Sequence, residues 1–115
     1  MKQAKYDSLR TVQARPGVTR KSFSGSGATL AWTALEPGHE PRPHSHPHEQ
    51  IVYVVSGRLR FTVGDEQTVV GPGDMLLVPP NVEHWAETIG DEPALDLSIF
   101  SPRRDEYSAE EDAGE

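Results

Sequence analysis

The five histidines of this sequence lie in two short segments that are rich in proline and glycine. Four of them fall within residues 39–48, and the fifth is His84. Histidine is the commonest metal-binding side chain in proteins, and it binds through a neutral ring nitrogen. A cluster of histidines that folding joins to one distant histidine therefore predicts a metal site.

The spacing of the clustered histidines favours this interpretation. Successive side chains of a β-strand point to opposite faces, so residues two apart share a face. In an extended chain His44 and His46 point the same way, and Gln50 shares their parity. Glu49 has the opposite parity to His46 and ranks below Gln50 as a further ligand, although both remain candidates.

The elements that must position these residues are short β-strands. Ten glycines and ten prolines interrupt the chain, and β-branched, aromatic or alternating runs lie between them. Short strands at regular spacing, separated by turn residues, are typical of an all-β sandwich or barrel. The predicted strands cover residues 28–35, 51–55, 59–63, 75–78 and 95–100.

Two of these strands carry information about what they face. In 95–100, the residues Asp96, Ser98 and Phe100 share one polar, pocket-like face, while the aliphatic residues between them share a face that resembles core. In 51–55 both faces are apolar. A strand that is apolar on both faces predicts a covering layer. We expect a second subunit to supply that layer, and therefore a homodimer.

Length and composition exclude several classes of protein. A chain of 115 residues is expected to form one domain. It has no cysteine, which excludes disulfides and thiolate zinc sites. No apolar run approaches the roughly 20 residues of a membrane span, and the first residues lack the apolar segment of a secretory signal. We therefore expect a cytoplasmic protein without a membrane partner.

The net charge of −7 is unevenly distributed. Residues 105–115 carry six carboxylates and no cation, whereas residues 1–21 carry six cations and one acid. Such charge runs are usually solvated, and the barrel lacks the basic face that nucleic-acid binding needs. The predicted organisation is an N-terminal arm over 1–20 (a candidate for a strand swapped between subunits), a barrel over 21–104 and an acidic, disordered tail over 105–115.

The histidine-rich segment resembles the first sequence motif of the cupin superfamily. That motif consists of a glycine, an HxH pair, a glutamate and a second glycine at fixed spacing. Gly38, His44, His46 and Gly57 fit it, and Gln50 occupies the position of the usual glutamate.

The segment around the fifth histidine resembles the second cupin motif. Gly73, Pro79 and His84 fit its spacing, while Asn81 replaces a glycine and Thr88 replaces an asparagine. Asparagine tolerates the left-handed backbone that a glycine would adopt, so this change is mild.

The resemblance covers about residues 25–100 and implies both a fold and a cofactor. The implied fold class is all-β: a single-domain cupin with an RmlC-like jelly-roll β-barrel. The implied cofactor is one divalent transition metal (Zn, Ni, Mn or Fe) inside the barrel. Its implied ligands are His44, His46, Gln50 and His84. His39 and His48 have no role in the motifs and are expected at the surface or rim.

A finer resemblance begins at Phe100. The run Phe-Ser-Pro-Arg-Arg-Asp is similar to the FSPxR(E/D)D ending of small cupins that open unsaturated monouronates. In that group the phenylalanine, the arginine and an aspartate two residues before the phenylalanine line the active site. Phe100 and Arg104 match, but Ser98 stands where the aspartate would be, and Asp96 lies one strand step away. The resemblance therefore implies catalytic roles for Arg104 and Asp96 in a pocket that includes Phe100 and Ser98.

These features predict a metal-dependent lyase or isomerase that acts on a small oxygenated anion such as a sugar acid. A metal polarises a substrate oxygen, and Arg104 or Arg60 would bind a carboxylate in a bidentate manner. Arg104 has an alternative role, because it could pair with acids of the tail instead. The alternative functions are an iron-dependent dioxygenase and a non-catalytic small-molecule-binding barrel, because one fold hosts many chemistries.

Overall fold

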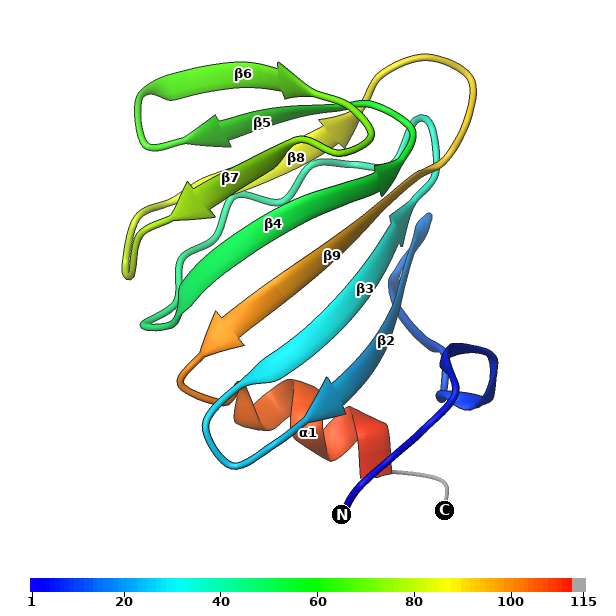
Figure 1. The fold of residues 1–115 in the computed structure, drawn as a ribbon. Coiled ribbons are helices and arrows are strands. Elements are labelled where there is room, and N and C mark those ends of the chain that lie inside the picture. The colour runs from blue at the N-terminus through cyan, green and yellow to red at the C-terminus, as the bar shows by residue number, and fades with distance from the viewer. Residues whose placement is uncertain (113–115) are drawn as a thin grey trace.

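The fold is described by a computed structural model, which places residues 1–112. Nine β-strands form two antiparallel sheets, with strand orders β1-β2-β3-β9-β4-β7 and β6-β5-β8 (Figure 1). The strands are β1 (Val12–Arg15), β2 (Val18–Ser24), β3 (Thr29–Leu35), β4 (Glu49–Ser56), β5 (Leu59–Val63), β6 (Glu66–Val70), β7 (Met75–Val78), β8 (His84–Thr88) and β9 (Ala94–Ser101). A short 3-10 helix, η1 (Tyr6–Ser8), precedes them, and the helix α1 (Asp105–Asp112) follows. This is the expected all-β jelly-roll barrel.

The hydrophobic core lies between the two sheets. Val52, Val54 and Val78 of the larger sheet pack with Leu59 and Phe61 of the smaller one. In β4 buried and exposed residues alternate, because every second side chain points into the barrel.

The inner face of β9 changes from apolar to polar along its length. Ala94 belongs to the core, whereas Asp96 and Ser98 are buried polar residues, followed by buried Phe100. This confirms the pocket-like face predicted for the strand. One end of the barrel is therefore packed with aliphatic side chains, and the other end holds polar groups.

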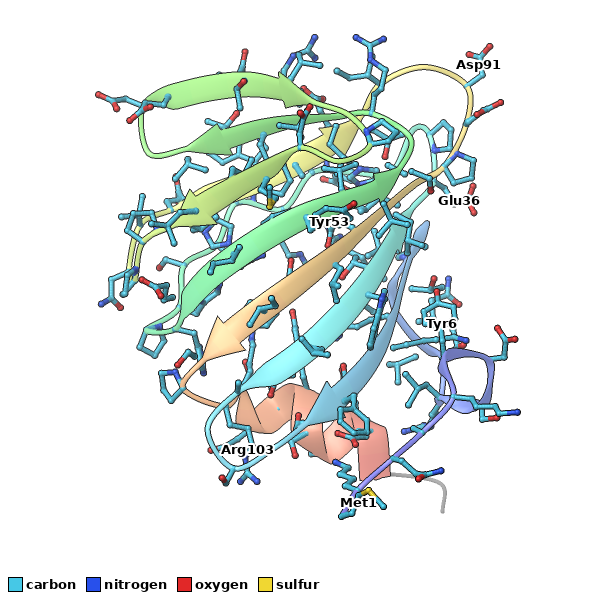
Figure 2. All side chains as sticks on the ribbon, in the orientation of Figure 1. Met1, Tyr6, Glu36, Tyr53, Asp91 and Arg103 are labelled. Carbon is cyan, nitrogen blue, oxygen red and sulfur yellow. The ribbon has the colours of Figure 1, made fainter. Side chains whose placement is uncertain are left out.

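The outer face of the larger sheet corrects one expectation. The aliphatic residues of β9 that were expected in the core are half-buried or exposed instead, because the second sheet covers only the inner face. The outer apolar residues of β4 are exposed in the single chain, so their cover by a second subunit stays a prediction. Cross-strand pairing arranges the outer side chains in two rows, Leu77–Ile51–Ile99–Leu30 and Met75–Tyr53–Leu97–Trp32. Met75 is 68% exposed and Leu77 53% exposed, and Figure 2 shows Tyr53 standing on this face. The single chain thus presents a broad apolar surface.

The N-terminal segment is more ordered than a simple arm. β1 pairs with β2 of its own chain, and β2 already begins at Val18 rather than after residue 20. Farther upstream, the ring of Tyr6 lies 5.4 Å from the ring of Trp32 in an edge-on contact, on the outer side of β3 (Figure 2). Exchange of this strand between subunits stays a prediction.

The acidic tail differs from the disordered segment that was expected. Residues 105–112 form α1, which lies against β2 and β3 (Figure 1). Glu110 forms an ion pair with Arg20, and Glu111 pairs with Lys2 and accepts a hydrogen bond from the backbone N–H of Ser24. Two of the carboxylates that looked solvated in the sequence, Glu110 and Glu111, are therefore neutralised by the basic N-terminal segment. Residues 113–115, the rest of the expected tail, lie outside the described residues.

No helix among residues 1–112 combines the length and the apolar character needed to cross a membrane.

Candidate metal centre

Two loops bring the three motif histidines together. His44 and His84 form an isolated antiparallel bridge, in which each backbone N–H donates to the carbonyl of the other at 3.1 and 2.9 Å. The carbonyl of His46 accepts a hydrogen bond of 2.8 Å from the N–H of Asn81. Asn81 adopts φ +64°, the left-handed conformation for which the cupin motif uses glycine. These backbone hydrogen bonds thus hold the segments of the two motifs next to each other.

The glycine at the end of the first motif is required by close packing. Gly57 has φ +77°. A Cβ atom there would lie 2.5 Å from Cα of Ala94 and 2.6 Å from the carbonyl oxygen of Pro93. Any side chain would push β9 away from the turn that follows β4. Because β9 carries Asp96 and Ser98, this contact helps to place the polar end of the barrel.

Each of the three histidines uses one ring nitrogen to hold its orientation. Nδ1 donates to a backbone carbonyl two residues away: from His44 to Arg42 at 2.8 Å, from His46 to His48 at 3.0 Å, and from His84 to Val82 at 2.9 Å. A carbonyl only accepts, so these bonds place the proton on Nδ1 and leave Nε2 with a free lone pair. Metal-binding histidines are typically oriented in this way.

The free nitrogens converge. Ligand atoms of the three histidines lie within 4.8 Å of one another, and the rings of His44 and His84 are 4.3 Å apart. Nε2 of His84 is buried and has no hydrogen-bond partner among the described residues. An unpartnered buried polar atom is rare in a folded protein. A bound cation would satisfy it, so the donor set fits a metal ion.

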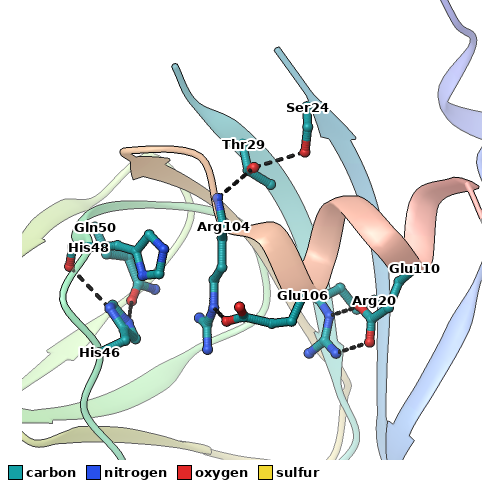
Figure 3. Close-up of polar contacts among 9 residues, drawn as sticks. All are labelled: Arg20, Ser24, Thr29, His46, His48, Gln50, Arg104, Glu106 and Glu110. Carbon is teal, nitrogen blue, oxygen red and sulfur yellow. Dashed lines mark hydrogen bonds and ion pairs between the residues drawn. The ribbon is translucent and has the colours of Figure 1, made fainter. Parts of the chain in front are cut away.

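Gln50 completes this arrangement. Its Oε1 lies 3.1 Å from Nε2 of His46 (Figure 3). Because Nδ1 of His46 carries the proton, both facing atoms are acceptors, and two acceptors attract each other only through a shared cation. Glu49, the competing candidate, is exposed on the other side of β4.

A buried chain of hydrogen bonds fixes the amide of Gln50. Its Nε2 donates to Oγ of Ser98 at 3.0 Å, and the hydroxyl of Ser98 donates to Oδ1 of Asp96 at 3.2 Å. As long as Asp96 accepts the serine proton, Ser98 has only lone pairs to offer Gln50. The amide nitrogen must then face Ser98, and the amide oxygen must face the histidines.

Burial also sets the charge of the centre. It lowers the pKa of His84 to about 4, and it is the main cause of the lowered pKa values of His44 and His46. The nearby positive charge of Arg104 lowers all three further. The imidazoles are therefore neutral at pH 7, which is the form that binds metal.

Asp96 is the titratable group behind the centre. It is 5% exposed. Burial raises the pKa of Asp96 to about 7, against the smaller opposing effect of the hydrogen bond from Ser98. A carboxyl group with this pKa can donate or accept a proton near neutral pH.

The centre opens into a cavity of about 90 Å³. This is small beside the roughly 300–1,000 Å³ of pockets for drug-sized ligands. The cavity brings together four of the residues predicted for a substrate pocket, namely Asp96, Ser98, Phe100 and Arg104. Their roles in binding or catalysis remain proposals.

Arg104 lies over two aromatic rings at the cavity wall. Its guanidinium carbon is 4.1 Å from the ring centre of Tyr107 and 4.9 Å from that of Phe100. Its Nε donates to the carboxylate of Glu106 (Figure 3). Arg104 thus has both of the placements considered from the sequence. It lines the cavity, and it pairs with an acid of the C-terminal segment.

Three predicted placements are wrong. Arg60 does not line this cavity, because it has the opposite parity to the core residue Phe61 and pairs with Glu87 at 3.1 Å. His39 and His48 are buried, each 8% exposed, rather than at the surface. Nε2 of His39 accepts the backbone N–H of Thr88, which gives this histidine a structural role.

Several other residues that line the cavity were not predicted from the sequence. They are Arg15, Arg20, Arg42, Trp85 and Tyr107. The parity of Arg20 with the buried Val18 and Ser22 was one available signal. Tyr107 is the one aromatic residue of the acidic segment, which is another.

Comparisons with known proteins agree with this architecture. The family model described as "Cupin domain" matches residues 31–100. An uncharacterised protein of Streptomyces coelicolor is 30% identical over 103 residues, which cover 89% of this chain and 97% of that protein.

Solved structures are similar over most of the chain. An RmlC-like cupin from Shewanella frigidimarina has a TM-score of 0.83 at 25% identity, covering 90% of this chain and 93% of that one. KdgF from a Halomonas species has a TM-score of 0.82 at 29% identity, covering 89% and 95%. With its two motifs joined at one histidine cluster and its family model matched over most of the barrel, the chain belongs to the cupin domain family.

Proposed function

We propose that this cupin is a metal-dependent lyase or isomerase that acts on a small oxygenated anion such as a sugar acid. One observation carries the proposal: unpaired lone pairs of His46, Gln50 and His84 converge beside a cavity that also contains a guanidinium and a buried carboxyl group. The cavity therefore has groups for metal binding, anion binding and proton transfer together.

His44, His46, Gln50 and His84 are the proposed ligands of the metal. Imidazole and amide donors suit Zn, Ni, Mn or Fe better than Ca or Mg, which prefer sets of oxygen ligands. When bound, such an ion would polarise a carbonyl or hydroxyl oxygen of the substrate. All four ligands are neutral, so they leave the positive charge of the ion uncompensated and favour an anionic substrate.

Asp96 is proposed as the general acid or base. Its pKa of about 7 suits proton exchange at neutral pH. It lines the cavity and is hydrogen-bonded to Ser98, the position at which the uronate-opening cupins have their aspartate. A proton on Asp96 is thus held two residues along the strand from where that group places its own.

Arg104 is proposed to bind a substrate carboxylate. Its guanidinium is oriented by the rings of Phe100 and Tyr107. Within residues 1–112, only its Nε is engaged, by Glu106. The two terminal nitrogens remain available for a bidentate contact with a carboxylate. Phe100 would shield this contact from water.

The test is turnover of unsaturated uronates and related sugar acids by the metal-reconstituted protein. We expect activity that is lost on chelation and that falls by at least about 100-fold in Asp96→Asn, the range of general acid–base catalysis. Arg104→Gln should raise KM more than it lowers kcat. Activity that survives both substitutions would refute the assigned roles. Oxygen consumption that depends on Fe(II) would instead indicate a dioxygenase, and ligand binding without turnover a binding barrel.

The assembly and its location are also proposals. The two apolar rows on the outer face of the larger sheet support a homodimer, because an exposed apolar patch of this kind usually marks a contact surface. A cytoplasmic location is consistent with the absence of cysteine from the sequence.

A further inference from the structure

The cavity beside the metal centre is lined by four arginines, Arg15, Arg20, Arg42 and Arg104. Two of them are neutralised by α1. Arg20 makes a bidentate pair with Glu110 at 2.9 and 2.7 Å, and Arg104 pairs with Glu106 (Figure 3).

Arg15 and Arg42 have no such partner. Within residues 1–112 neither side chain forms an ion pair or a hydrogen bond. Nε of Arg15 is moreover buried without a hydrogen-bond partner there. A buried donor of a charged group that lacks an acceptor is costly. Arg15 is therefore positioned to receive an acceptor from outside the chain, and the exposed Arg42 is open to the same acceptor.

The two arginines lie together at one side of the cavity. Both also line an outer hollow next to it, formed together with residues 16–17 and 37–40. The charge of Arg42 is, after burial, the second cause of the lowered pKa of Arg15. Arg42 is joined to the metal centre through its carbonyl, which accepts the Nδ1 proton of His44 at 2.8 Å.

The acid Glu40 could compete with an anionic ligand for Arg15. Glu40 lies near enough to raise the pKa of Arg15, although it forms no ion pair with Arg15 in the part of the chain that the structure describes. Its side chain is exposed. With Glu106 and Glu110 already paired, two guanidinium charges of the cavity wall have no ion-pair partner among residues 1–112.

We propose that Arg15 and Arg42 form a second anion subsite, which binds an acidic group of the ligand away from the one held at the metal and Arg104. The preferred ligands are then small dianions, such as hydroxylated dicarboxylates, rather than monoacids. The identity of the ligand as a substrate rests on the proposed function, but the anion subsite itself does not require a metal.

The test compares two acids of the same four-carbon skeleton, tartrate with two carboxylates and threonate with one. Their affinities are measured by calorimetry at low ionic strength, on metal-free and on zinc-loaded protein. Wild-type protein should bind tartrate at least about tenfold tighter than threonate in both forms, as expected for one added charge-assisted contact.

Four variants resolve the contribution of each group. Arg15→Gln and Arg42→Gln should each reduce the preference to within about twofold, whereas Arg15→Lys should retain part of it. Glu40→Gln should strengthen tartrate binding. Arg58→Gln, which alters an exposed arginine outside the cavity, is the matched control and should leave the preference unchanged.

The outcomes separate this inference from the proposed function. Tartrate preference in metal-free protein without any turnover would support the subsite while refuting the enzyme. Turnover without the preference would refute the subsite alone. Equal binding of both acids, no binding of tartrate, or a preference that survives the double variant Arg15→Gln/Arg42→Gln would overturn the inference. If Arg15→Gln does not fold, the exposed Arg42 carries the test.

Discussion

Ser98 is the residue on which the orientation of the proposed fourth ligand depends. It accepts from the amide of Gln50 and donates to Asp96. Without its hydroxyl, no other hydrogen bond among the described residues would require the amide oxygen of Gln50 to face the histidines. Ser98 thus acts on the metal through another side chain.

We predict that Ser98→Ala weakens metal binding by about 10- to 100-fold, the usual effect of removing a group that orients a ligand. Competition with a chromophoric chelator measures this affinity. Ser101→Ala, at an exposed position of the same strand, should leave it unchanged. An unaltered affinity in Ser98→Ala would show that Gln50 is not held in this way.

Asp96 makes stability depend on pH. In the unfolded chain its pKa is about 3.8, whereas burial raises it to about 7 in the folded protein. Between these values the folded state binds the extra proton, so the contribution of Asp96 to stability falls as the pH rises from about 4 to 7 and is then constant.

Asp96→Asn should remove this dependence. We expect the variant to gain free energy of unfolding relative to wild type as the pH rises through this window. Urea titrations of the metal-free proteins at pH 5, 6, 7 and 8 measure the difference. A difference that does not change with pH would contradict the raised pKa.

At the residue scale, the spacing of the motif residues predicted the candidate ligands. The residues that reach the cavity from distant parts of the chain could not be predicted in this way. Parity correctly placed Gln50 on the inner face of β4, because period two is a local property of a strand. His44 and His46 lie outside the regular strands, so their approach to Gln50 follows from the loop before β4 and not from strand parity. Arg15 and Arg42 reach the cavity only through the fold. Arg60 was misplaced because a charge in a sequence gives no direct sign of which sheet face it occupies.

Sequence reasoning missed the strands β2, β6 and β8, the short helix η1 and, most clearly, the helix α1. Its composition is strongly acidic and its apolar residues form no clear stripe, so nothing local indicates a packed helix. It is held by contacts to distant residues: Arg20 pairs with Glu110 and lies 3.9 Å from the ring centre of Tyr107. The strands β3, β4, β5, β7 and β9, in contrast, follow from local alternation and turn residues.

Glu110→Gln tests this contact. Arg20 is largely buried and the pair is bidentate, so we expect the substitution to cost about 1 kcal/mol. The thermal unfolding midpoint should then fall by about 4 °C. Asp105→Asn, which removes an exposed pair with Arg103, is the control and should change it by less than about 1 °C. Equal midpoints in both variants would show that α1 is not anchored through Arg20.

At the scale of the whole molecule, the barrel is unevenly covered. Its inner faces enclose the core and the metal centre, while η1 covers only the Trp32 end of the outer face. The remaining parts of the two apolar rows are open in the single chain. A second copy of the chain, packed sheet against sheet, would bury them.

Ile51→Glu places a charge in the middle of this face. We predict that wild-type protein is a dimer at micromolar concentration and that the variant is a monomer, because a buried unpaired charge is costly. Light scattering coupled to gel filtration measures this. Thr68→Glu, on the exposed strand β6, is the control and should remain a dimer. A monomeric wild type would refute the prediction.

The central claim is that the convergent lone pairs of His44, His46, Gln50 and His84 bind one transition metal. Elemental analysis of protein loaded with zinc and then desalted tests it most directly. Wild-type protein should retain about one ion per chain, and His46→Ala and His84→Ala close to none. His39→Gln, which alters a buried histidine outside the centre, should still retain one. Equal metal content in wild type, His46→Ala and His84→Ala, with the fold intact by circular dichroism, would contradict the account.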